Sequence, residues 1–138
     1  MANFELIERL PTVGEHAALW AAVGWGTVNQ DMSAASLGGS VYGVVIQHED
    51  RIIGMGRIVG DGSMYFYIQD VAVLPEFQSR GAGQQIVEQL LKYIAAHSRP
   101  GAGAFTGLFA SHGNDSFYER YGFRNHAPGM TGMFKVME

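Results

Sequence analysis

The segment from Asp70 to Gly83 carries the residues best suited to chemistry in this chain of 138 residues. It runs Asp-Val-Ala-Val-Leu-Pro-Glu-Phe-Gln-Ser-Arg-Gly-Ala-Gly, an apolar β-rich run followed by a turn of small residues. A helix that begins at such a turn offers free backbone N–H groups and the positive end of its dipole to an anion. Because Gly81 and Gly83 have no side chain, a phosphate can approach the main chain closely. The turn therefore predicts a phosphate site.

Two other phosphate-binding patterns do not fit this turn. No Gly-Lys-Ser/Thr follows it, as a Walker loop requires. The pair Gly54-x-Gly56 lacks the third glycine of a dinucleotide motif and falls in a predicted strand. The remaining alternative is an ordinary strand-to-helix loop in which the glycines only ease the turn.

The segment Ser116-Phe-Tyr-Glu-Arg-Tyr-Gly-Phe123 holds a second candidate, Tyr118. A tyrosine hydroxyl is protonated at neutral pH and can pass its proton along one hydrogen bond, which suits a general acid. The alternative is a tyrosine that packs on an amphipathic helix, as Phe117 and Tyr121 do at a spacing of four.

In their order, the two motifs resemble those of the GCN5-related N-acetyltransferases, the GNAT superfamily. Gln78-Ser-Arg-Gly-Ala-Gly83 fits the Gln/Arg-x-x-Gly-x-Gly/Ala signature that grips the pyrophosphate of acetyl-CoA. Tyr118 falls where many members protonate the departing CoA thiolate. The resemblance implies pyrophosphate contacts from Gln78, Ser79, Arg80, Gly81, Ala82 and Gly83.

The resemblance also implies contacts to the pantetheine arm of the cofactor. In the family the strand before the glycine turn bonds this arm through its backbone, like an added strand. Here that backbone is Val71, Ala72 and Val73. An Asn often contacts the arm seven residues before the tyrosine, and this chain has Ser111 at that position.

The general base is less clearly marked. The family places a Glu or His in the middle of the strand that ends at the turn, where this chain has Tyr67 and Gln69. Asp70 is the only carboxylate of that strand and is the candidate base. Alternation puts it on the opposite face from Tyr67 and Gln69, unless a bulge shifts the register. A water relay without a dedicated base is the alternative, as is an Asp70 that only orients a loop.

The acceptor site is expected, by resemblance, at the early helices and the loop between them. Trp25 could form an aromatic wall that attracts an amine, or be a core residue. Tyr65 and Tyr67 could line a pocket or face the core. Asp61 is best explained as a hairpin-turn residue. The five histidines show no metal-ligand spacing, so no metal is expected.

These residues need strands and helices to position them. Hydrophobic periodicity predicts helices over 14–23, 31–37, 81–96 and 115–121. It predicts strands over 4–10, 41–47, 51–59, 64–74, 104–110, 123–125 and 131–136. The expected fold is α/β (mixed α+β): one GNAT-like domain over 1–138 with a mostly antiparallel sheet. A parallel pair of strands flanks the cofactor cleft, and helices cover both faces.

Composition narrows the function further. The chain is 47% hydrophobic and 16% charged, which is typical of a globular domain. Its net charge is -4 without a Lys/Arg block, so a nucleic-acid partner is not expected. There are no cysteines, which excludes disulfides, zinc–thiolate sites and a cysteine nucleophile. No apolar run approaches the ~20 residues of a membrane helix, and no signal peptide is evident. A cytoplasmic location is expected.

The sequence as a whole favours an N-acetyltransferase that moves the acetyl group of acetyl-CoA directly to a primary amine of a small molecule. A non-catalytic module that binds acyl-CoA is the first alternative. An unrelated α/β phosphate-binding domain is the second. Homodimers are frequent in the GNAT superfamily, so the resemblance also points to a homodimer.

Overall fold

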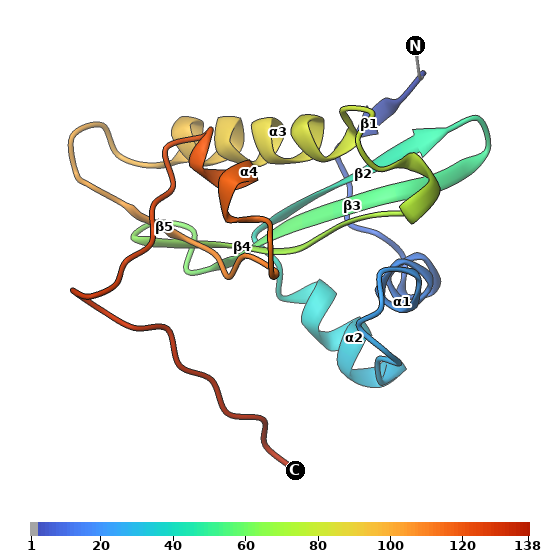
Figure 1. Cartoon of the computed structure of the whole chain (residues 1–138), viewed down its shortest axis with the longest axis horizontal. Coiled ribbons are helices and arrows are strands. Elements are labelled where there is room, and N and C mark those ends of the chain that lie inside the picture. The colour runs from blue at the N-terminus through green and yellow to red at the C-terminus, as the bar shows by residue number, and fades with distance from the viewer. Residues whose placement is uncertain (1–2) are drawn as a thin grey trace. The chain divides into compact units, whose positions relative to one another are not determined.

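The computed structural model describes residues 3–138 of the chain. These residues form two compact units that meet in sequence between Gly107 and Leu108. Within residues 3–107 the first unit contains a five-stranded sheet and three α-helices (Figure 1).

The sheet has the strand order β1-β2-β3-β4-β5. All neighbouring strands are antiparallel except β4 and β5, which are parallel. The predicted mixed sheet with one parallel pair is therefore confirmed. Its strands are β1 (Glu5–Ile7), β2 (Tyr42–His48), β3 (Arg51–Gly60), β4 (Tyr65–Val73) and β5 (Phe105–Gly107).

Helices cover both faces of this sheet, as expected (Figure 1). The long helix α3 (Ala82–His97) packs on β2, β3 and β4 from one side. On the other side α1 (Val13–Ala22) packs on β3 and β4, and α2 (Gln30–Gly38) packs on α1. The helix predicted over 81–96 is thus found, and α3 buries Ile86, Val87, Leu90 and Ile94 on one face.

Gly56 sets how closely α3 approaches the sheet. A Cβ atom built on Gly56 would lie 2.4 Å from Cγ2 of Ile86 and 3.2 Å from Cδ1 of Leu90. Protein interiors are packed too densely to absorb such an overlap without movement. The glycines that loosened the predicted strand 51–59 therefore have a packing reason: they let the helix sit directly on β3.

A capping box fixes the start of α1. The hydroxyl of Thr12 accepts the N–H of Glu15, and the Glu15 carboxylate accepts the N–H of Thr12. Arg9 binds the same carboxylate at 2.8 Å and, ahead of the Thr12 contacts, holds the pKa of Glu15 below its usual value. Because the pKa of Glu15 is lower in the folded state, the contact stabilises the fold fully at pH values above the ordinary Glu pKa. This stabilisation is lost as the pH falls through the lowered pKa of Glu15.

The β3–β4 hairpin ends in the turn that the sequence predicted. One carboxylate oxygen of Asp61 accepts the N–H groups of Ser63, Met64 and Tyr65 at 2.8–2.9 Å. These backbone donors, Tyr65 first, lower the pKa of Asp61. The assignment of Asp61 to the turn is confirmed.

A β-bulge at Asp70 is the exception to simple alternation that the sequence left open. Met55 pairs with Ala72 and Arg57 pairs with Gln69, so Gly56 alone faces both Asp70 and Val71. Asp70 takes a left-handed backbone conformation with φ 56°, which Asp and Asn tolerate better than most residues. Its side chain consequently turns to the face of Arg57 and Gln69, where it meets α1. Simple alternation had placed it on the opposite face.

The second unit, Leu108–Glu138, contains the short helix α4 (Asp115–Glu119). The strands predicted over 123–125 and 131–136 are wrong, because the structure has neither helix nor strand after Glu119. A strand exists only if its backbone finds a partner, and Pro128, Gly129 and Gly132 weaken the local tendency to extend. The apolar side chains of this tail are 65–90% exposed: Met130, Met133, Phe134, Val136 and Met137.

We expect Gly56→Ala to lower the free energy of unfolding by about 1–3 kcal/mol, because the added methyl group overpacks the β3–α3 contact. Gly38→Ala is the matched control. Gly38 lies in α2, and nothing lies within 4 Å of the place that its Cβ would take, so its replacement should be neutral or stabilising by up to ~1 kcal/mol. Urea denaturation followed by circular dichroism measures both. Equal stability of the two variants would contradict the tight approach.

Candidate functional site

The glycine turn joins β4 to α3 through the short 3-10 helix η1 (Pro75–Phe77). Gln78 ties the turn back to the strand, because its side-chain amide donates to the carbonyl of Val73 at 3.0 Å. Ser79 and Gly81 both have positive φ, 64° and 93°. Gly81 is the N-cap of α3 and provides no side-chain cap, so the first N–H groups of the helix are left to an external acceptor.

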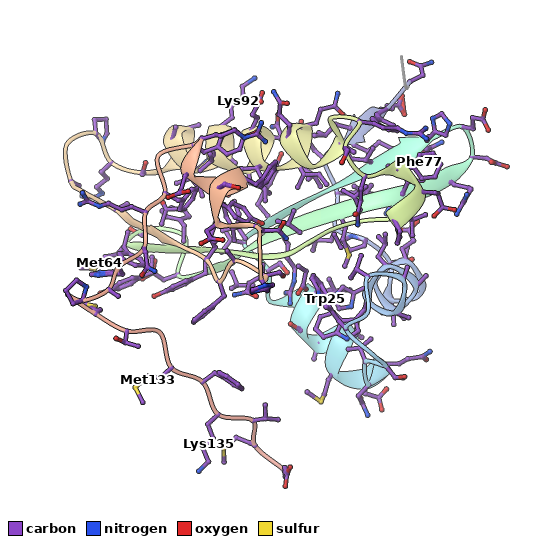
Figure 2. The ribbon with its side chains drawn as sticks, viewed as in Figure 1. Trp25, Met64, Phe77, Lys92, Met133 and Lys135 are labelled. Carbon is purple, nitrogen blue, oxygen red and sulfur yellow. The ribbon has the colours of Figure 1, made fainter. Side chains whose placement is uncertain are left out.

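The charges around this turn favour an anion. The first turn of α3 contains no acidic residue, so nothing opposes the positive end of the helix dipole. The guanidinium of Arg80 lies over the ring of Phe77 at 5.7 Å, and Arg51 lies over the same ring at 5.6 Å. Figure 2 shows Phe77, the last residue of η1, at one end of the sheet. Arg51 also faces the carboxylate of Glu76 at 3.9 Å, so the cation that this arrangement offers to an anion is Arg80.

The strand before the turn has an unpaired edge. β4 pairs with β5 only at Tyr65, Phe66 and Tyr67. Among residues 3–138, the main chain of 68–73 has no strand partner on the β5 side, although it stays paired with β3 on the other. This stretch includes Val71, Ala72 and Val73, the predicted backbone contacts. An extended ligand that carries amide groups could bond here as an added strand.

Asp70, which lies within that stretch just before Val71, is the centre of a buried polar cluster. Its Oδ2 accepts Nε of Arg57 at 2.8 Å and lies 3.0 Å from Nε2 of His16. The other ring nitrogen of His16, Nδ1, lies 2.7 Å from the hydroxyl of Ser33. Arg57 also donates to the backbone carbonyl and hydroxyl of Ser36 at 3.1 and 2.9 Å. We call Ser33, His16, Asp70 and Arg57 the Asp70 cluster.

The cluster is enclosed by the fold. His16 is 2% exposed, Ser33 1% and Arg57 8%, and the side chain of Asp70 is 9% exposed. A neutral His16 that keeps its proton on Nε2 donates to Asp70 and accepts the Ser33 hydroxyl at Nδ1, so both ring nitrogens have a partner. Buried charges are tolerated only when paired and hydrogen-bonded in this way.

The two tryptophans of the chain extend this cluster toward the surface. The ring of Trp20 lies 5.4 Å from that of His16 and 5.2 Å from that of Trp25. The indole N–H of Trp20 donates to the carbonyl of Trp25 at 3.0 Å. Trp25 is 37% exposed, so the core alternative for this residue does not hold and one part of the ring faces solvent. Figure 2 shows it beside α1 and α2.

Two predicted site residues, Ser111 and Tyr118, lie in the second unit. Ser111 is exposed in the loop before α4, and its carbonyl accepts the N–H of Asn114. Tyr118 is half-buried in α4, with its ring 5.1 Å from Phe117 and 6.1 Å from Phe123. Burial raises the pKa of the Tyr118 phenol. The roles of both residues stay predictions.

Sequence reasoning identified the turn, the strand edge and Asp70, and the first unit brings these together. It missed His16, Ser33 and Arg57. One signal was available: Arg57 is a lone charge within the apolar run Ile52-Ile-Gly-Met-Gly-Arg-Ile-Val59, and such a charge demands a buried partner. Asp70, the only carboxylate of the neighbouring strand, is that partner.

No group of three or more His, Asp or Glu side chains suited to a metal ion occurs within residues 3–138. Over the same residues, no helix has the length and apolar character needed to cross a membrane.

Residues 39–125 match the family model of the acetyltransferase (GNAT) domain. GCN5-related N-acetyltransferase 2 of Arabidopsis thaliana, a chloroplastic protein, is 35% identical over 88 residues, which are 64% of this chain and 33% of that protein. The chain spans about a third to a half of the length of the curated relatives that it matches.

Solved structures show the same fold. A protein of unknown function from meticillin-resistant Staphylococcus aureus, SA2161, described as a probable acetyltransferase, superposes with a TM-score of 0.91 at 30% identity. The match covers 98% of this chain and 100% of that one. AAC(6')-Iy, solved with the bisubstrate analog CoA-S-monomethyl-acetylneamine, is 14% identical with a TM-score of 0.69, and the match covers 99% of each chain.

We expect Asp70→Ala to lower the free energy of unfolding by about 3–5 kcal/mol, because Arg57 keeps a buried charge without its partner. Asp70→Asn should cost less. It keeps an oxygen acceptor and tolerates the left-handed backbone, so it removes only the charge. Urea denaturation of both variants measures the difference. A loss below ~1 kcal/mol in the Ala variant would show that the cluster contributes little to stability.

Proposed function

We propose, from the premise that this chain belongs to the GNAT acetyltransferase family, that it transfers the acetyl group of acetyl-CoA directly to a primary amine of a small molecule. One observation carries the proposal. An uncapped helix start and an unpaired strand edge adjoin each other in one segment. The first suits a diphosphate and the second an extended arm with amide groups. Acetyl-CoA has both.

The cofactor contacts follow from this arrangement. The backbone of Val71, Ala72 and Val73 would bond the pantetheine arm along the edge that β5 leaves open. The turn Gln78–Gly83 would hold the pyrophosphate, with N–H groups at the start of α3 and the charge of Arg80 near it. We propose Ser111 as a further cofactor contact on the resemblance of its position.

The transfer itself needs few protein groups. The amine nitrogen attacks the thioester carbonyl carbon, so a C–N bond forms while the C–S bond breaks. The nitrogen gives up a proton, and the departing thiolate takes one from the phenol of Tyr118, which solvent then restores. With no cysteine in the chain, the acetyl group cannot pass through a cysteine thioester, which is consistent with direct transfer.

For the proton that leaves the amine, we propose a water relay. Asp70, the other candidate base, has an arginine 2.8 Å from its carboxylate. His16 contacts the same carboxylate oxygen at 3.0 Å, so Asp70 is already engaged by two side chains of the fold. Its enclosure by His16 and Arg57 also limits access to a substrate. An anchoring role for Asp70 fits its surroundings better.

Trp25 supports a small amine as the acceptor. Its partly exposed ring offers a π-face next to the helices α1 and α2, and such a face attracts an ammonium group or stacks on an aryl one. A primary amine arrives in solution mostly as its cation, so the ring could hold it before deprotonation.

A thiol-release assay tests the proposal. Purified protein is mixed with acetyl-CoA and a panel of primary amines (arylalkylamines, polyamines and amino sugars), and free CoA thiol is followed over time. We expect release with at least one amine. Acetyl-CoA binding without any thiol release would favour the second candidate function, a non-catalytic module that binds acyl-CoA. The engagement of Asp70 by Arg57 and His16 favours this candidate too, because it leaves the site without an evident general base. No acetyl-CoA binding would overturn both.

We expect Tyr118→Phe to lower kcat by about 10²–10⁴-fold, the usual contribution of a general acid, with little change in acetyl-CoA affinity. Because the acid must be protonated, kcat should fall as the pH rises through the pKa of Tyr118. Burial raises this pKa above the ordinary value near 10, so the alkaline limb should lie above pH ~10 and vanish in the Phe variant.

Tyr121→Phe is the matched control, since it removes a hydroxyl three residues away on the same segment. Its kcat and its alkaline limb should match those of the wild type. An unchanged rate in Tyr118→Phe would remove Tyr118 from the mechanism.

A further inference from the structure

The imidazole of His16 joins three separate elements of the fold. It belongs to α1, it contacts Asp70 on β4 through Nε2, and it contacts Ser33 on α2 through Nδ1. At 2% exposed it cannot reach a substrate, and both of its ring nitrogens are engaged. A histidine in this situation does not act as a base. It fixes the positions of α1, α2 and β4 relative to one another.

On one side of His16 lies the strand that the proposed function assigns to the cofactor. Asp70 directly precedes Val71, and its φ of 56° forms a bulge inside the unpaired stretch 68–73. The direction of the backbone N–H and C=O groups after the bulge depends on this conformation. The contact with His16 holds the bulge against α1.

On the other side of His16 lies the loop between α1 and α2. The rings of His16, Trp20 and Trp25 follow one another at 5.4 and 5.2 Å. Few apolar contacts hold α2, since Leu37 is its one buried apolar residue among those described, and its other buried residue is Ser33. Polar contacts therefore attach this helix to the sheet. Ser33 bonds His16, which bonds Asp70 of β4, and Arg57 of β3 donates directly to Ser36.

We propose that His16 is a positioning residue. It holds α1, α2 and Trp25, together the α1–α2 layer, in a fixed position relative to β4, the strand proposed to bind acetyl-CoA. The inference rests on the proposed acetyl transfer and adds a residue to it. The amine, received at the α1–α2 side, must meet the thioester held on β4 within a few tenths of an ångström, and a misplacement of ~1 Å can cost about 10²-fold in rate. Loss of the His16 contacts acts on the amine and leaves acetyl-CoA binding in place.

Two substitutions separate the contacts of His16. The amide of His16→Gln can reach the place of Nε2 and keep the bond to Asp70. The shorter amide of His16→Asn can reach the place of Nδ1 and keeps only the bond to Ser33. We expect His16→Asn to lower kcat/KM for the amine by about 10–100-fold, with the Kd for acetyl-CoA within about twofold. His16→Gln should stay within about fivefold of the wild type.

Tryptophan fluorescence gives a readout that does not need turnover. The chain has two tryptophans, Trp20 and Trp25, and both lie on the path from His16. We expect the emission maximum to shift to the red in His16→Asn, because the indoles gain solvent, and to stay in place in His16→Gln. His97→Asn is the matched control, since His97 is exposed at the end of α3, and it should change neither kinetics nor emission.

Three outcomes would overturn the positioning role. The first is equal kinetics and equal emission in the Asn and Gln variants. The second is a loss of acetyl-CoA affinity in His16→Asn as large as the loss for the amine. The third applies if His16→Asn does not fold, in which case Ser33→Ala, which removes one hydroxyl, replaces it. We expect Ser33→Ala to shift the emission and raise the KM for the amine in the same direction, by smaller amounts. Wild-type emission together with a wild-type amine KM would overturn the positioning role. If the wild type turns over no amine, the proposed function fails, and the emission arm still tests the position of the α1–α2 layer.

Discussion

A carboxylate buried between the sheet and α1 is the constraint on which much of this structure depends. Asp70 cannot remain charged in the interior without partners, because the loss of hydration of an unpaired charge exceeds what a marginally stable fold can supply. Its partners come from three directions: Arg57 from β3, His16 from α1 and, through His16, Ser33 from α2. The partners that Asp70 requires therefore fix how α1 and α2 pack on this side of the sheet.

The opposite face is held by a different kind of interaction. α3 lies on β2, β3 and β4 through apolar side chains, and the absence of a Cβ atom at Gly54 and Gly56 lets it approach the sheet closely. Dense apolar packing gives a rigid platform, and the glycine turn Gln78–Gly83 lies at one end of it. The proposed donor site is thus built on a packed layer, while the proposed acceptor side is attached by directional polar contacts. Directional contacts fix orientation more narrowly than apolar packing does.

The parts of the fold that local sequence determines were predictable. The helix α3, the glycine turn from which it starts and the turn at Asp61 each follow from residue types at short spacing, and each is found. The face of Asp70 and the strands expected after Phe123 were not, because both depend on pairing with a distant segment. A bulge is a property of two strands in register, and a strand without a partner has no backbone hydrogen bonds to hold it. The Asp70 cluster was hidden for the same reason: His16 and Asp70 are 54 positions apart.

The bulge also changes how this strand corresponds to those of other proteins. Before it, Tyr67 and Gln69 lie on the face of Arg57, the face of α1; after it, Val71 packs by Gly56 on the face of α3. The odd-numbered residues of β4 thus lie on one face before Asp70 and on the other face after it. A single pattern of alternating faces does not describe the whole strand. In a sequence alignment with a protein whose strand runs straight, a one-residue gap belongs opposite Asp70. An ungapped alignment would match each residue on one side of the bulge with the wrong face of its counterpart.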